Sequence, residues 1–174
     1  MTQKFGKLDI LINNAGIARS EGGDWGTSTA SIISQEILKE IYETNFFGLV
    51  AVTQTFLPLL KKSAAARIVN VGSMLGSLTM HADFEGPLKG FKTFGYNSSK
   101  TAVNAFTIHL AAELRETPHK VNTAHPGWVK TDLGTDAATH AVAVREKDAL
   151  VDVSVTVVDE HFVDLVGAGL VVGL

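Results

Sequence analysis

A tyrosine and a lysine stand four residues apart in the segment Gly95-Tyr96-Asn97-Ser98-Ser99-Lys100. Apolar residues follow at helical spacing, so we expect a helix that runs from this segment to about residue 115. Residues four apart share one face of a helix, which places the Lys100 ammonium beside the Tyr96 phenol. A free tyrosine has a pKa of about 10, and a neighbouring positive charge can lower it by roughly 1–3 units. The pair is therefore suited to proton transfer near neutral pH.

The same pair has a purely structural interpretation. A Tyr-x-x-x-Lys spacing arises by chance in roughly one such sequence in eight. A half-buried tyrosine beside a solvated lysine would account for it. The chemical interpretation therefore depends on which other residues the fold brings to Tyr96.

Three short apolar segments are the expected strands: residues 8–13, 67–73 and 120–125. Runs this apolar are typical of strands buried on both faces of a parallel sheet. A long helical pattern from about Ser34 to Leu60 separates the first two, and Pro58 is expected to bend or end it. Its stripe comprises Ile37, Ile41, Leu49, Val52, Phe56 and Leu60, with Asn45 as the one polar member. The alternation predicts an α/β fold with a doubly wound parallel sheet.

Polar and glycine-containing segments follow each expected strand. They are Asn13–Gly16, Ser73 and Pro126–Thr131. Ligands of such sheets bind beyond the carboxyl ends of the strands, so these segments should meet at one rim, where Tyr96 also lies. Residues 74–95 contain several glycines and no clear period, and we expect a structureless lid or substrate loop there. This convergence is far less probable by chance than the tyrosine–lysine pair alone.

The chain resembles the short-chain dehydrogenase/reductase family over about residues 4–135. The matching residues follow the family's order: Asn13-Asn14-Ala15-Gly16, Asn45, Ser73, Tyr96-x-x-x-Lys100 and Pro126-Gly127-Trp128-Val129-Lys130-Thr131. The long segment before Tyr96 resembles the carbonyl-reductase-like branch. The resemblance implies a partial Rossmann-like doubly wound sheet, the carboxyl-terminal half of the family fold. It also implies hydride transfer between NAD(P)H and a small carbonyl or alcohol substrate.

The resemblance implies a role for each of these residues. Tyr96 would act as general acid or base, while Lys100 would lower its pKa and hydrogen-bond the nicotinamide ribose. Ser73 would hold the substrate oxygen, and Asn45 would help to place a water that links Lys100 to solvent. NADP or NAD, with NADP preferred, would bind to Asn13, Asn14, Ala15, Gly16, Lys100, Pro126, Gly127, Val129 and Thr131. Asn45 could instead satisfy a backbone group where its helix bends, and Ser73 could only cap the segment after its strand.

The two ends of the chain depart from the family. The family opens with a glycine-rich turn that receives the cofactor pyrophosphate, and the sequence contains neither Gly-x-x-x-Gly-x-Gly nor Gly-x-Gly-x-x-Gly. We therefore interpret residues 1–138 as the catalytic part of the domain, in a fragment or mis-started reading of a longer enzyme. Residues 139–174 are a divergent tail, in which valines from Val151 to Val157 alternate with polar residues as in a half-buried strand. A frame-shifted reading is the alternative. In the family's sheet order, residues 8–13 would form a bare edge. The valine-rich tail could cover this edge or seed aggregation itself, and we expect aggregation because nothing in the sequence specifies the register of such a pairing.

The composition excludes several other classes of protein. A net charge of −3 argues against a generally basic nucleic-acid binder or an anionic-membrane partner, and the absence of cysteine excludes disulfides and thiolate metal sites. The histidines have no ligand spacing, and no window approaches the roughly 20 apolar residues of a membrane span. The default expectation is a cytoplasmic enzyme with no metal. A partner-binding remnant without catalysis, and an epimerase or dehydratase with the same pair, remain alternatives; substrate and oligomeric state are open.

Overall fold

The computed structural model describes residues 6–20, 28–129 and 154–156 of the 174-residue chain. In these residues one sheet has the strand order β1-β2-β3-β4. Its strands are β1 (Ile10–Asn13), β2 (Arg67–Val71), β3 (Lys120–His125) and β4 (Ser154–Thr156). β1, β2 and β3 are mutually parallel, whereas β4 pairs antiparallel with β3. The predicted parallel α/β architecture is therefore confirmed.

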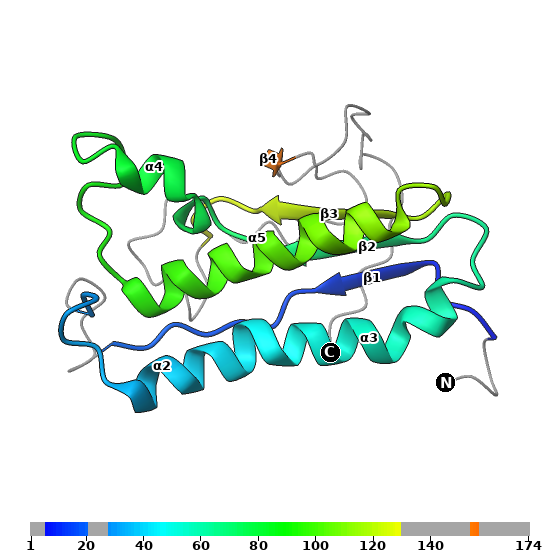
Figure 1. Cartoon of the computed structure of the whole chain (residues 1–174), viewed down its shortest axis with the longest axis horizontal. Coiled ribbons are helices and arrows are strands. Elements are labelled where there is room, and N and C mark those ends of the chain that lie inside the picture. Colours follow the sequence, from blue (N-terminus) through cyan, green and yellow to red (C-terminus); the bar gives the residue numbers. More distant parts are fainter. Residues whose placement is uncertain (1–5, 21–27, 130–153, 157–174) are drawn as a thin grey trace.

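The helices connect these parallel strands. α2 (Gln35–Tyr42), the π-helix η2 (Glu43–Gly48) and α3 (Leu49–Leu60) form one continuous helical segment between β1 and β2. The 3₁₀ turn η3 (Met74–Gly76), α4 (Leu78–Ala82) and α5 (Phe94–Leu114) lie between β2 and β3. α3 packs on β1 and α5 on β3, and the amino-terminal part of α5 also contacts α2 and η2 (Figure 1). None of the described helices is long and apolar enough to cross a membrane.

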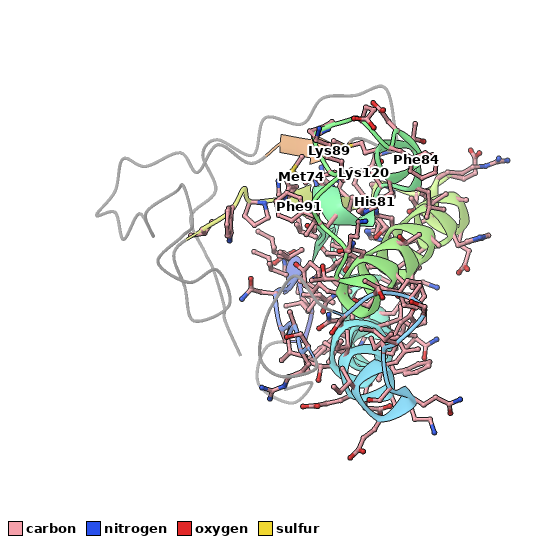
Figure 2. The ribbon with its side chains drawn as sticks, turned by 90° about the vertical axis from the view of Figure 1, so that its left-hand side faces the viewer. Met74, His81, Phe84, Lys89, Phe91 and Lys120 are labelled. Atoms are coloured by element: carbon pink, nitrogen blue, oxygen red, sulfur yellow. The ribbon has the colours of Figure 1, made fainter. Side chains whose placement is uncertain are left out.

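Both helical connections cover the same face of the sheet (Figure 2). The order β1-β2-β3 means that both crossovers step in one direction, and right-handed crossovers of this kind place their helices together. Of the two helical layers of a doubly wound fold, the described residues thus contain one. In β2, Ile68 and Asn70 are buried while Val69 and Val71 are only partly so. Burial on both faces, which the apolar runs had predicted, is not seen in this strand because the described helices cover only one face.

The hydrophobic core lies between the helical layer and this face. Its buried members are Leu60, Ala66, Ile68, Leu110, Leu114 and Val121. Leu11 and Phe106 pack against them from β1 and α5. Burial of apolar area at roughly 25 cal/mol per Å² is the main force that holds the two layers together. This core fixes the strand ends, and with them the rim that carries the polar residues.

The buried stripe of the first helical segment differs from its prediction at one position. Ile41, Asn45, Leu49 and Thr53 are buried at intervals of four, whereas Val52 is 38% exposed. A π-turn holds more residues than an α-turn. Buried positions on one face are therefore spaced by four residues through η2, and the next buried position is Thr53 in place of Val52. Pro58 lies within α3, which ends two residues later at Leu60, as expected.

Residues 74–95 were expected to form a structureless loop. They instead contain the 3₁₀ turn η3 and the helix α4. Ser73 accepts a hydrogen bond from the Leu75 amide (3.2 Å) and caps η3, and Ser77 accepts one from the Met80 amide (3.3 Å) and caps α4. Serine side chains satisfy free amides at helix starts in this way. The strand predicted in the valine-rich tail is present as β4, but it pairs with β3 and so leaves the β1 edge uncovered by the described residues.

Candidate active site

Tyr96 and Lys100 share one face of the first turns of α5, as their spacing predicted. The Lys100 Nζ lies 5.6 Å from the centre of the Tyr96 ring. The Ser73 hydroxyl is a hydrogen-bond partner of the Tyr96 phenol. Ser73 directly follows Gly72 at the carboxyl end of β2, so two elements bring these three side chains to one rim of the sheet. Ser73 therefore does more than cap the turn that follows it.

The pKa of the Tyr96 phenol is raised, mainly because burial disfavours the phenolate, and the Ser73 hydrogen bond opposes this effect. The overall shift in the protein without ligands is thus opposite to the one expected from Lys100 alone, and the predicted effect of Lys100 on the phenol stays a prediction. Burial also lowers the pKa of the Lys100 ammonium, to about 8. A phenol with a raised pKa stays protonated at neutral pH and is a proton donor in its resting state.

Lys100 is the charged group at the centre of the site. Its side chain is only 4% exposed, and its Nζ donates a hydrogen bond of 2.8 Å to the Val71 carbonyl oxygen. The segment after β1 passes directly over it, since a Cβ built on Gly16 would lie 3.5 Å from the Lys100 Nζ. An ammonium has three protons to donate, so Lys100 can serve the Val71 carbonyl and further acceptors together.

Asn45 lies at the π-turn η2 and is completely buried. Its Oδ1 accepts from the Ile17 amide (2.7 Å), and its Nδ2 donates to the Ile17 carbonyl (2.9 Å) and to the Ser99 hydroxyl (3.0 Å). Asn45 thus satisfies backbone groups beside the π-turn, as the alternative interpretation of this residue had proposed. These bonds hold the segment after β1 against α5, beside Lys100. The predicted role of Asn45 in placing a water stays a prediction.

The Asn13 side chain, at the end of β1, lies inside the fold. Its Nδ2 donates to the Thr53 hydroxyl and to the Asn70 Oδ1, both at 2.8 Å, and the Asn70 Nδ2 donates to the Thr107 hydroxyl at 2.9 Å. These four buried side chains lie between the sheet and α3 and α5. The Asn13 side chain is thus committed to a network inside the fold, and the predicted contribution of residue Asn13 to cofactor binding stays a prediction.

The remaining predicted binding residues lie beyond the ends of β1 and β3. Asn14 and Ala15 are exposed, and Gly16 is partly buried between Asn45 and Lys100. After β3, Gly127 has a φ of +79°, a conformation that favours glycine, and Pro126 and Val129 beside it are partly buried. Thr131 lies outside the described residues. The expected convergence of these segments on the rim is consistent with the parallel direction of all three strands.

Two functional features were missed from the sequence. Thr53 and Asn70 are the partners of Asn13, and Thr107 is the partner of Asn70. All three are polar residues at otherwise apolar positions of a helix or strand, and that mismatch was the available signal. Thr101, directly after Lys100, and Asn104, one helical turn beyond Lys100, contact the turn that carries Ser73. Among the described residues, no group of three or more His, Asp or Glu side chains is placed to hold a metal ion.

The sequence is similar to a family of known proteins. The sequence profile of the short chain dehydrogenase family matches residues 1–141. Short-chain dehydrogenase anuI of Penicillium roqueforti is 39% identical over 136 residues, which cover 76% of this chain and 51% of that protein. Dehydrogenase/reductase SDR family member 7B of mouse is 34% identical over 137 residues, covering 79% and 37%. The chain thus spans about half the length of the curated relatives or less.

Solved structures of carbonyl reductases also resemble this chain. The NADPH-bound carbonyl reductase from chicken fatty liver superposes with a TM-score of 0.64 at 33% identity, covering 76% of this chain and 52% of that one. Carbonyl reductase Sniffer of D. melanogaster superposes with a TM-score of 0.68 at 31% identity, covering 81% and 56%. The similarity therefore extends over most of the described fold and about half of each carbonyl reductase.

Proposed function

Because the chain belongs to the short-chain dehydrogenase family, we propose that it forms the catalytic part of an NAD(P)-dependent oxidoreductase that interconverts a small carbonyl compound and its alcohol. One observation carries the proposal: the Tyr96 phenol lies between the Ser73 hydroxyl and the Lys100 ammonium at the carboxyl ends of the strands. Proton transfer to an oxygen needs a donor of this kind, held in a fixed place. The carbonyl reductases among the structural relatives support the reaction class.

In the direction of reduction, Tyr96 donates its proton to the substrate oxygen. The raised pKa of the phenol keeps that proton in place at neutral pH. The Ser73 hydroxyl, now bonded to the phenol, offers a second donor to the same oxygen. Two fixed donors stabilise the negative charge that develops on the oxygen, which is the principle of an oxyanion hole. Oxidation of an alcohol uses the same groups in reverse.

Lys100 stabilises the phenolate that proton transfer leaves behind. Its Nζ lies 5.6 Å from the ring centre, close enough for charge stabilisation in a buried site. Because the pKa of Lys100 is about 8, its ammonium remains the predominant form at pH 7 and still exchanges protons readily near neutrality. This explains why the positive charge matters most during the reaction rather than in the resting protein.

The nicotinamide cofactor, when bound, supplies or accepts the hydride. Residues of this chain fit its ribose and nicotinamide end: the Lys100 ammonium is a hydrogen-bond donor, and Gly16 lies beside it, directly after the exposed residues Asn14 and Ala15. We assign Asn14 to Gly16, Pro126, Gly127, Val129 and Thr131 to the same surface. NADP is the preferred form, since relatives carry NADPH or NADP in their structures, ElxO among them at 30% identity and a TM-score of 0.60.

The test is an activity measurement on a completed domain, in which the amino-terminal half of a carbonyl reductase precedes residue 4 of this chain. We expect NADPH-dependent reduction of aldehydes or ketones. Lys100→Ala should lower both turnover and cofactor affinity, because Lys100 acts on the phenol and on the ribose. Lys61→Ala, at an exposed lysine that follows α3, is the control and should change neither. Unchanged turnover in Lys100→Ala would refute the assignment.

A further inference from the structure

The turn that carries Ser73 is attached to α5 at both of its ends. We call residues 72–76 the serine turn. Before it, the Val71 carbonyl oxygen accepts from the Lys100 Nζ at 2.8 Å. At its end, the Gly76 carbonyl oxygen accepts from the Thr101 hydroxyl at 3.0 Å and from the Asn104 Nδ2 at 3.4 Å. One face of α5 therefore holds the serine turn from start to finish.

Two glycines allow the serine turn to approach this closely. A Cβ on Gly76 would lie 2.8 Å from the Lys100 carbonyl carbon and 2.9 Å from its oxygen, which no side chain could tolerate. A Cβ on Gly72 would collide with the Thr123 hydroxyl and would lie 3.4 Å from the Asn104 Oδ1. The turn thus rests directly on the backbone of α5 at one end and against β3 at the other. Its position relative to Lys100 is fixed by backbone contact.

The orientation of Ser73 follows from the geometry of this turn. The Ser73 carbonyl oxygen accepts from the Gly76 amide at 2.9 Å, and its hydroxyl oxygen accepts from the Leu75 amide at 3.2 Å. The Leu75 amide donates to the hydroxyl oxygen, and the same hydroxyl is a hydrogen-bond partner of the Tyr96 phenol. A shift of Gly76 would therefore be transmitted to the Ser73 hydroxyl through the bonds of the turn.

We propose that Thr101 and Asn104 are positioning residues, which hold Gly76 and thereby set the Ser73 hydroxyl against the Tyr96 phenol. Neither residue is proposed to contact the substrate or the cofactor; both bond to the Gly76 carbonyl oxygen. They act through Ser73, Thr101 from the position directly after Lys100 and Asn104 from one helical turn beyond Lys100. The catalytic importance of this arrangement rests on the proposed function, whereas the arrangement itself is measurable in the chain without cofactor.

Asn104 has an unusual feature that supports this role. Its Oδ1 is buried, and within the described part of the chain it has no hydrogen-bond partner. Exchange of the amide oxygen and nitrogen would bring two oxygens together at the Gly76 carbonyl, so the observed orientation is fixed. A buried acceptor without a partner costs free energy. Asn104 is thus a poor choice for stability alone but a suitable one for holding Gly76.

The experiment measures the pKa of Tyr96 by fluorine NMR. Tyr42→Phe leaves Tyr96 as the single tyrosine, and 3-fluorotyrosine, a more acidic phenol, brings its titration into a range where the fold persists. Ser73→Ala should raise the pKa, because the hydrogen bond from Ser73 lowers it. Thr101→Val and Asn104→Leu should each reproduce part of that rise, and Thr101→Ser should restore the parent value. Both variants should have no further effect in the Ser73→Ala background.

Thr55→Val is the matched control. Thr55 is an exposed threonine of α3 whose hydroxyl bonds to the Ala51 carbonyl at 2.7 Å, four residues back, as that of Thr101 does to Asn97. It should not alter the pKa of Tyr96. Amide exchange at Leu75 and Gly76 provides a second measurement and should accelerate in Thr101→Val and Asn104→Leu only. Asn104→Leu should be as stable as the parent, since it also removes the unsatisfied acceptor.

The outcomes separate the possibilities clearly. An unchanged Tyr96 pKa in Thr101→Val, alongside a rise in Ser73→Ala, would overturn the proposal. A further rise in the Ser73→Ala background would overturn it too, because the two residues would then act without Ser73. Should Asn104→Leu fail to fold, Thr101→Val alone decides. Because no cofactor is needed, these results are independent of whether the completed domain reduces carbonyl compounds.

Discussion

Two clusters of polar side chains, one inside the fold and one at the rim of the sheet, differ in what they can do. The interior cluster is Asn13, Thr53, Asn70 and Thr107, linked by three side-chain hydrogen bonds of 2.8–2.9 Å. The rim cluster is Ser73, Tyr96 and Lys100. The interior cluster contains only groups that cannot titrate, each bonded to another. The rim cluster holds two groups with shifted pKa values and donors that can still reach a ligand.

This difference shows that burial of polar groups does not by itself mark an active site. Inside the fold, satisfied hydrogen bonds join β1 and β2 to α3 and α5, and they specify the packing of these layers. At the rim, the same low-polarity surroundings act on groups that gain or lose protons, and the resulting pKa shifts make chemistry possible. The position at the carboxyl ends of the strands gives a substrate access to them.

The largest expected effect is weak binding of the cofactor, because the rim cluster includes no site for the cofactor pyrophosphate. The sequence has no glycine-rich turn, whose amides would donate charge-assisted hydrogen bonds to a pyrophosphate. Each such bond contributes about 1.5–3 kcal/mol, so the loss of two or three should weaken binding of NADPH by about a thousandfold or more. Isothermal titration should detect no tight binding to the chain alone. Low-micromolar affinity would show that the rim binds the cofactor without a phosphate site.

The next effect is the pH dependence of stability that Lys100 causes. Burial lowers its pKa from 10.5 to about 8, a difference of about 2.5 units, so the unfolded chain binds the proton more tightly. The free energy of unfolding should therefore increase as the pH rises from about 8 towards 10, by up to about 3 kcal/mol. Urea unfolding of the parent and of Lys100→Met across this range measures it. Equal pH slopes in the two proteins would contradict the burial of a charged Lys100.

Mutation of the interior cluster should lower the stability of the fold and leave the pKa of Tyr96 unchanged. Asn13→Ala removes the donor for the Thr53 hydroxyl and the Asn70 Oδ1, and a buried group left unsatisfied costs about 1–3 kcal/mol. Urea unfolding should detect this loss at neutral pH. The fluorine-detected pKa of Tyr96 should not change, since no side-chain hydrogen bond among the described residues connects Asn13 to the rim cluster. A shifted Tyr96 pKa would mean that the two clusters are coupled.

The distinction between the clusters was only partly predictable from the sequence. Apolar segments located the three parallel strands, and the carboxyl ends of these strands located the rim, because topology alone brings those ends together. The direction of the Asn13 side chain was also accessible. Side chains alternate along a strand, so Asn13 lies on the same face as Leu11, which packs on the core under the helices. The motif had placed residue Asn13 at the rim, and the alternation indicates that its side chain lies inside the fold.

Other features depend on three-dimensional surroundings. The sign of the Tyr96 pKa shift was mispredicted because the spacing reveals a neighbouring ammonium but not how deeply the phenol is buried. The π-turn η2 has no simple sequence signal, and it moved the buried stripe from Val52 to Thr53. The turns at Ser73 and Ser77 were predictable in principle, since serine is a frequent helix cap. Their glycine-rich surroundings concealed that signal.

The most direct test of the account is the turnover of the completed domain with Tyr96→Phe, compared with Tyr42→Phe. The second variant removes the same hydroxyl from the other tyrosine of the described chain, which packs against Phe46 and Phe47 on the first helical segment. We predict that Tyr96→Phe lowers kcat by about 10²–10⁴-fold, the usual contribution of a general acid, with cofactor affinity nearly unchanged. Tyr42→Phe should retain parent turnover. Near-parent kcat in Tyr96→Phe would contradict the assignment of Tyr96 as the proton donor.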